Sequence, residues 1–252
     1  MYSYKPPQYL LILLLGLVSF AIYSNSLQGE FLIDDYQAIL RNPRLHSPQP
    51  YLKKELNLGI GWGALWDLSH VLIWRFWGPR SFYYHLFNVL AHVACVALLF
   101  VLCQSLFSNP ALSFLTSLIF ALHPIHTEAI SWISGGHYAF SAVFFIATLW
   151  AYVKSGQGIF YFLLTALFFA LCVASGNAAV PLPIVFIIYD LFFREKEPPR
   201  LRRLRLIILP AIILTAFLGA GVFFARRNKF IHTIFYFRGA SYLVVITKAI
   251  GY

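Results

Sequence analysis

Long runs without any charged residue constrain this sequence more than any other feature. The runs lie between Lys5 and Glu30, Arg80 and Glu128, Glu128 and Lys154, Lys154 and Asp190, and Arg205 and Arg226. About 20 apolar residues suffice to cross the hydrocarbon core of a bilayer, so the two longest runs each have room for two crossings. The sequence therefore predicts an all-α, polytopic membrane protein.

The composition agrees with this class and excludes others. The chain is 60% hydrophobic and only 11% charged, outside the usual range of soluble domains. Its formal net charge of +10 does not indicate a nucleic-acid partner, because the basic residues lie in short connections between apolar segments. Cys95, Cys103 and Cys172 fall inside apolar segments without paired spacing, so we expect small core residues instead of a disulfide frame or a metal cluster.

We expect seven to eight transmembrane helices in a single domain that covers residues 1–252. The predicted spans are Gln8–Ser26, Tyr83–Leu106, Ala111–Leu122, Tyr138–Val153, Ile159–Ala174, Ala179–Phe193, Leu206–Phe224 and a weaker one at Phe235–Tyr252. The first is interpreted as a retained helix, because its apolar stretch is long and no clear cleavage site follows it. Residues 27–82, called the first loop below, are rich in Trp and Phe and predict short interfacial helices.

The positions of Lys and Arg predict the orientation in the membrane. Arg194–Arg205 carries the densest set of basic residues, which places residues 194–205 on the cytoplasmic side. Because each span brings the chain to the other side of the membrane, Lys154 is expected on the same side as residues 194–205. The first loop, His123–Glu128 and Ser175–Asn177 are expected on the opposite side. We therefore expect a multi-pass protein of a bacterial inner membrane or an equivalent membrane, with its polar residues gathered at the extracytoplasmic face.

Paired carboxylates follow the first span, in Phe31-Leu32-Ile33-Asp34-Asp35. Ionisable groups at a membrane boundary are usually functional or paired. Because adjacent residues point in different directions, we expect one carboxylate to act as a general base on a reacting hydroxyl and the other to be held by backbone or a cation. The alternative is a helix cap or a turn, which Asp also favours.

A second polar cluster lies in Ala121–Gly136, ALHPIHTEAISWISGG, called the histidine segment below. His123, His126 and Glu128 interrupt an apolar stretch here. One interpretation is recognition of an anionic headgroup or positioning of a reacting group. The other is a helix terminus satisfied by its own backbone, with Thr127 or Glu128 as the cap.

Two further possibilities concern metals and cofactors. Asp34, Asp35, His123, His126 and Glu128 are suitable ligand types for a divalent zinc or manganese ion, but no spacing signature supports such a site. His85, Asn88 and His92 share one face of the second span. Hydrogen bonding between helices is the expected role of this face, and ligation of haem or chlorophyll is the alternative.

Four segments in this order resemble the GT-C class of polytopic glycosyltransferases: FLIDDYQAILRNP, YHLFNVLAHVACVALLF, ALHPIHTEAISWISGGHYAFSA and ASGNAAVPLPIVFIIYDLFFRE. The sequence is most similar to TMTC-type O-mannosyltransferases and their bacterial relatives, over most of Tyr9–Phe193. The resemblance implies a GT-C-like core and transfer of a sugar from a polyprenyl-phosphate carrier to an acceptor at the extracytoplasmic face. A lipid-linked sugar and membrane lipids would be its partners.

The resemblance also implies roles for individual residues. It points to Asp34 as the catalytic carboxylate, with Asp35 as its catalytic neighbour. The residues expected to bind substrate are His123, His126, Glu128, Arg75, Arg80 and Asn177. The two arginines would serve the departing phosphate.

The sequence departs from the family pattern in three places. Ser134-Gly135-Gly136-His137 stands where relatives commonly have Ser-Gly-Arg followed by an acid, and Ser175-Gly176-Asn177 stands where Ser-Lys-Glu is common. Relatives also continue through further spans, so we expect either a fragment or a shortened relative. A non-catalytic subunit of a larger membrane complex, packed against other membrane proteins, is therefore the alternative to an enzyme.

Overall fold

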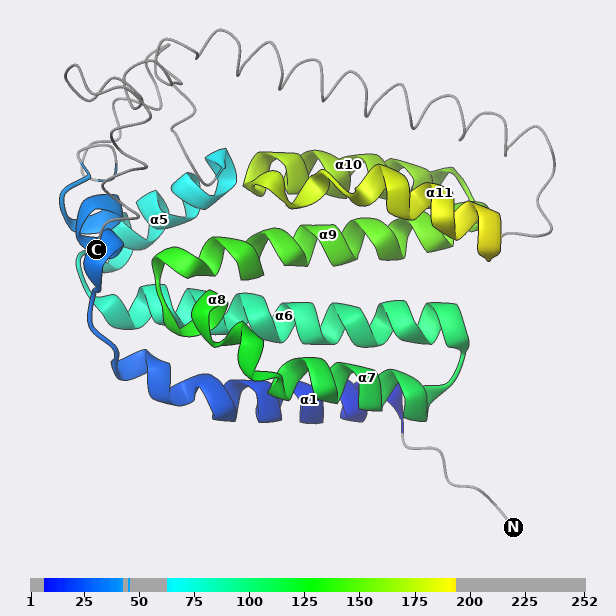
Figure 1. Cartoon of the computed structure of the whole chain (residues 1–252), viewed down its shortest axis with the longest axis horizontal. Helices are drawn as coiled ribbons and strands as arrows, with labels where there is room; N and C mark the ends of the chain where they lie inside the picture. Colours follow the sequence, from blue (N-terminus) through cyan, green and yellow to red (C-terminus); the bar gives the residue numbers. More distant parts are fainter. Residues whose placement is uncertain (1–6, 43–44, 46–62, 194–252) are drawn as a thin grey trace, which may run out of the picture. The chain divides into compact units, whose positions relative to one another are not determined.

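The computed structural model describes residues 7–42, 45 and 63–193, which contain helices and turns but no strand (Figure 1). The apolar helices are α1 Gln8–Tyr23, α6 Ser81–Phe107, α7 Pro110–Leu122, α9 His137–Lys154, α10 Ile159–Ser175 and α11 Leu182–Phe192. This part of the chain confirms the all-α class.

Three helical stretches are long and apolar enough to cross a membrane. They are Gln8–Gln28, which joins α1 to the 3₁₀ helix η1 (Ser24–Gln28), then α6, and Ser134–Gln157, which contains α9. The helices α7, α10 and α11 are apolar but shorter. The predicted spans Leu206–Phe224 and Phe235–Tyr252, and the basic connection 194–205, lie outside the described residues.

Helix α6 is the centre of the packing. It contacts α1 and α7 on one side and α9 on the other, and α9 also packs on α10 (Figure 1). Val89, Cys95, Val96 and Phe100 of α6 are 0–1% exposed. Helices inside a bilayer associate through close van der Waals packing of such side chains, so α6 is the helix against which α1, α7 and α9 are held.

Local signals explain why α6 and α7 form an antiparallel pair. Ser108, the residue after α6, has a left-handed φ of 52°, which turns the chain away from the helix. The side chain of Asn109 then accepts hydrogen bonds from the backbone N–H groups of Ala111 (3.1 Å) and Leu112 (3.2 Å). Pro110 occupies the first helical position, where no N–H group is needed.

The helices run in alternating directions, so residues distant in sequence meet at one end (Figure 1). The carboxyl ends of α1 and α7 and the amino ends of α6 and α9 lie there, whereas Lys154 is at the other end of α9. We call this the polar end. The chain divides into two compact units after Ile188, within α11, and the packing described here is that of the first unit. The single domain over 1–252 stays a prediction.

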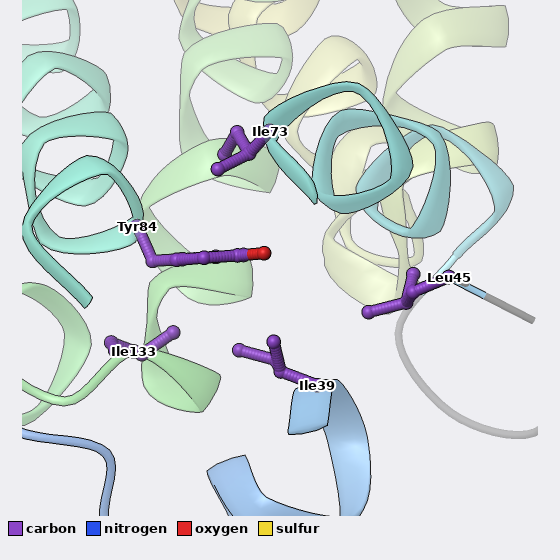
Figure 2. Close-up of a cluster of buried hydrophobic side chains, with 5 residues drawn as sticks. All are labelled: Ile39, Leu45, Ile73, Tyr84 and Ile133. Atoms are coloured by element: carbon purple, nitrogen blue, oxygen red, sulfur yellow. The ribbon is translucent and has the colours of Figure 1, made fainter. Parts of the chain in front are cut away.

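The described part of the first loop folds against the polar end. It contains α2 Ile33–Asp35, the π-helix η2 Tyr36–Leu40 and the amphipathic helix α5 Ala64–Trp77. Ile39, Leu45, Ile73, Tyr84 and Ile133 form a buried cluster that joins this loop to α6 and to the histidine segment (Figure 2). The loop is therefore attached to the helices by an apolar core of its own.

One expectation about the first loop is wrong in part. Phe76 and Trp77 of α5 are exposed, as expected of an interfacial helix, but Trp66 is only 5% exposed. The Trp66 ring packs against His70, with ring centroids 4.2 Å apart, and against Phe140 at 5.9 Å. An amphipathic helix must bury one face, and Trp66 lies on that face.

Candidate functional site

Asp35 connects the first loop to the histidine segment. Its side chain is fully buried, and one carboxylate oxygen, Oδ1, accepts hydrogen bonds from the backbone N–H (2.9 Å) and the hydroxyl of Ser134. The other oxygen, Oδ2, accepts from the backbone N–H of Leu32 at 2.9 Å and caps α2. Hydrogen bonds to a charged acceptor are stronger than neutral ones, so Asp35 fixes the two segments to each other.

Asp34 has a different environment from its neighbour. It occupies the same short helix α2 but is exposed. The expectation of two roles agrees with this placement, since Asp35 is held by backbone and hydroxyl donors while the Asp34 carboxylate remains accessible. An accessible carboxylate beside a buried anchor can accept a proton from a hydroxyl group that approaches the polar end.

The histidine segment consists of three short helices in succession. These are η3 Pro124–His126, α8 Thr127–Ser131 and η4 Ser134–Gly136. The cap of the first is the side chain of His123, whose Nδ1 accepts a hydrogen bond from the backbone N–H of Ile125 at 3.2 Å. The predicted caps Thr127 and Glu128 are therefore wrong. Because Nδ1 of His123 accepts this hydrogen bond, the ring proton is on Nε2. Nε2 is therefore a hydrogen-bond donor on an exposed ring.

His126 lies inward of His123. Its ring contacts Phe120, with centroids 4.3 Å apart, and is 5.5 Å from the ring of His92 and 6.0 Å from that of His123. Burial lowers the pKa of His126, and the neighbouring His123 lowers this pKa further. The lowered pKa favours the neutral imidazole, which interacts with an anion through a hydrogen bond.

Asn88 of α6 holds the turn that carries Ser134. The side chain is completely buried, and its Nδ2 donates to the carbonyl oxygens of Trp132 (3.0 Å) and Ile133 (3.2 Å), with a longer contact to Ile130 (3.4 Å). A Cβ atom at Gly136 would overlap the Asn88 amide. Glycine is thus required at this position by the close approach of Asn88.

His85, one turn before Asn88, faces the first loop. It is 2% exposed, and its imidazole lies against the backbone of Gly29 and Glu30 without a hydrogen bond of good geometry among the described residues. A Cβ at Gly29 would come within 2.8 Å of Nε2 of His85. The expected polar face of α6 therefore exists, and Asn88 makes the predicted bonds to another segment.

The other predicted site residues lie on segments at the polar end (Figure 1). Arg75, in the last turn of α5, and Arg80, before α6, are exposed. Glu128 is exposed in the first turn of α8. Asn177 begins the 3₁₀ helix η6 (Asn177–Ala179). The role of each of these four residues stays a prediction.

The described residues include no group of three or more His, Cys, Asp or Glu side chains arranged to hold a metal ion. Asp34, Asp35, His123, His126 and Glu128 therefore do not form the common ligand set considered from sequence. Cys95, Cys103 and Cys172 are free and buried, which agrees with their expected role as core residues.

Sequence reasoning missed one residue of this site, Ser134, and also the burial of Trp66 in the first loop. The bond between Ser134 and Asp35 spans 99 positions, and no local pattern encodes it. A partial signal was present, because two glycines directly after a serine indicate close packing of backbone. The burial of Trp66 was missed because the first loop was interpreted as interfacial throughout.

Several known proteins are similar to this chain. Protein O-mannosyl-transferase TMTC1 of Homo sapiens is 32% identical over 209 residues, which cover 71% of this chain and 23% of that protein. Protein O-mannosyl-transferase tmtc2 of Xenopus laevis is 30% identical over 247 residues, covering 90% of this chain and 29% of that protein. Protein O-mannosyl-transferase TMTC3 of Homo sapiens is 37% identical over 158 residues, which cover 57% of this chain and 17% of that protein.

The chain thus spans between 17% and 29% of the length of these relatives. No family model matches the chain, and no solved structure gives a significant match. The apolar helices and the similarity to these transferases together identify a membrane protein that resembles glycosyltransferases.

Proposed function

Because the chain is a relative of the TMTC-type protein O-mannosyl-transferases, we propose that it is a polytopic membrane glycosyltransferase with a GT-C-like core. In this proposal it transfers a sugar from a polyprenyl-phosphate carrier to an acceptor hydroxyl at the extracytoplasmic face, in a bacterial inner membrane or an equivalent one. The observation that carries the proposal is the hydrogen bonding between Asp35 and Ser134, which joins the carboxylates of the first loop to the histidine segment.

The reaction would be a direct displacement at the anomeric carbon. Asp34, the exposed carboxylate, takes the proton of the acceptor hydroxyl as that oxygen forms its bond to carbon. The bond from carbon to the phosphate oxygen breaks, and the electron pair leaves with the lipid phosphate. Asp35, the second carboxylate, is satisfied by three donors, so its part in catalysis is to hold α2 in place.

The departing phosphate needs donors of hydrogen bonds or positive charge. His123 offers the N–H of its exposed ring, and the neutral His126 offers a second imidazole. Arg75 and Arg80, both exposed near the start of α6, supply the positive charge. Glu128 and Asn177 are assigned to the sugar hydroxyls, for which carboxylate and amide groups are suitable partners.

The proposal is tested by transfer in membranes supplied with a labelled polyprenyl-phosphate mannose. Wild-type membranes should incorporate label, and Asp34→Asn, which is isosteric but cannot accept the proton, should abolish incorporation while the amount of folded protein is unchanged. Glu30→Gln, a change of another exposed acid in the first loop, is the matched control and should retain transfer. Retained transfer by Asp34→Asn would eliminate Asp34 as the base.

A non-catalytic subunit is the second candidate, and one observation favours it. At Gly136, where the family pattern has a cation, the space next to the backbone is taken by the Asn88 amide. Native purification in mild detergent distinguishes the two functions. A catalytically silent subunit should copurify with stoichiometric membrane partners, whereas a chain isolated alone would contradict that role.

A further inference from the structure

We propose that Ser134 and Asn88 are positioning residues for Asp34 and act through Asp35. This inference rests on the proposed glycosyl transfer and identifies which part of the chain orients its base. Neither residue would touch the substrate. Their effect is to fix the short helix α2, on which Asp34 is carried.

Asp34 lies on α2, a single turn of helix. The turn α2 (Ile33–Asp35) continues directly into the π-helix η2 (Tyr36–Leu40), and a helical stretch this short is not stable by itself, because nucleation of a helical turn is unfavourable. Asp35 supplies the missing constraint through its own cap at Leu32 and through its two bonds to Ser134. Since Asp34 is the preceding residue of the same turn, the direction in which its side chain leaves the backbone is set when Asp35 is anchored.

Ser134 must itself be fixed to serve as an anchor. It lies at the start of η4 and is 3% exposed. Asn88 fixes the two residues before it, because its Nδ2 binds the carbonyl oxygens of Trp132 and Ile133. The amide of Asn88 also packs against the backbone of Gly136, so the turn is held on both sides of Ser134.

Asn88 and His85 are on the same face of α6, and His85 supports the first loop at Gly29. Helix α6 therefore contacts the first loop at Gly29 through His85, and the turn of Ser134 through Asn88. Such a rigid foundation suits a base that must stay aligned, because a misplacement of about 1 Å can reduce a rate by about 100-fold.

The test is a double-mutant cycle between Asp35 and Ser134, with transfer of labelled mannose from polyprenyl phosphate as the activity. Ser134→Ala removes the hydroxyl donor but leaves the backbone N–H, and Asp35→Asn weakens the same bonds from the other side. Each change should lower kcat by about 10- to 100-fold with little change in the KM for the donor. The double variant should lose little more than either single variant, because both remove one interaction.

Two further variants separate positioning from general stability. Ser105→Ala deletes a hydroxyl that bonds to the Val101 carbonyl in the opposite half of α6, and it should leave kcat unchanged. Ser134→Thr keeps the hydroxyl and should restore most of the activity per folded molecule. Hydrogen exchange measured on the same samples should become faster in residues 30–41 when Ser134 is changed to Ala, whether or not the protein is active.

The outcomes distinguish the inference from the proposed function. If wild-type protein transfers no sugar, the proposed function fails, and the exchange data still decide whether Ser134 anchors α2. If wild-type protein is active and Ser134→Ala has the same kcat as Ser105→Ala, the positioning role is overturned. Unchanged hydrogen exchange in Ser134→Ala would overturn the anchor itself.

Discussion

Replacement of Gly136 by Ala should destabilise the protein, although the backbone conformation at this position does not require glycine. Gly136 has φ −59° and ψ −17°, values that any residue adopts. At such a position an alanine usually stabilises a protein by about 0.4–1 kcal/mol, because it restricts the unfolded chain. Here the added Cβ would overlap the amide of Asn88, so the sign of the effect should be reversed.

The magnitude follows from the contacts that Asn88 must give up. Its bonds to the carbonyl groups of Trp132 (3.0 Å) and Ile133 (3.2 Å) are each worth about 1 kcal/mol. Displacement of a side chain in a packed interior costs about 1–3 kcal/mol more. After subtraction of the ordinary benefit of alanine, Gly136→Ala should lower the free energy of unfolding by about 2–5 kcal/mol.

The assay is reversible unfolding of the purified protein in detergent micelles, with Gly16→Ala as the matched control. A Cβ at Gly16, inside α1, would lie 3.5 Å from Cγ1 of Val93, an ordinary contact, so this change should be neutral or slightly stabilising. Asn88→Ser should make room for the alanine. The loss in free energy of unfolding in the double variant should therefore be smaller than the sum of the losses in the two single variants. Equal stability of Gly136→Ala and Gly16→Ala would refute the close approach.

Three other changes have defined outcomes. Burial lowers the pKa of His70 from its ordinary 6.5 to about 4. Between these two pH values His70 is protonated only in the unfolded protein, so the free energy of unfolding should fall by up to about 3 kcal/mol as the pH decreases from 6.5 to 4. An equal pH dependence of unfolding in His70→Gln would contradict this. Asn109→Ala removes the cap of α7 and should cost about 1 kcal/mol in the same unfolding assay, whereas Asn25→Ala, at an exposed position, should cost little. Gly29→Ala should lower the melting temperature because its Cβ would meet the His85 ring, and His85→Ala should relieve the defect; a normal melting temperature for Gly29→Ala would argue against the contact.

The helices could be predicted from sequence because membrane-spanning segments have a simple physical requirement. Their length and lack of charge are fixed by the bilayer, so the predicted span Tyr83–Leu106 differs from α6 by only one or two residues at each end. The start of α7 was also encoded locally, in Asn109 and Pro110. The boundaries of segments with mixed character are encoded less clearly, and α11 begins at Leu182 instead of the predicted Ala179.

The site was only partly predictable because its contacts are non-local. The pairing of Asp34 with Asp35 predicted two different roles, but which carboxylate is buried depends on Ser134, which is 99 positions away from Asp35. Pro124 does start η3, as its fixed φ favours, but the cap is the preceding residue, His123, and not Thr127 or Glu128. Tertiary packing determines which residue is buried or acts as a cap, and local sequence propensity does not encode this.

The most direct test of the account is the side of the membrane on which the first loop and the histidine segment lie. Single cysteines at the exposed positions Glu30 and Glu128 can be labelled with a membrane-impermeant maleimide in intact spheroplasts, with Gln157→Cys, at the far end of α9, as the opposite-side control. We expect Glu30→Cys and Glu128→Cys to react from outside, and Gln157→Cys to react only after permeabilisation. Labelling of Glu30→Cys and Glu128→Cys from opposite sides would contradict this expectation.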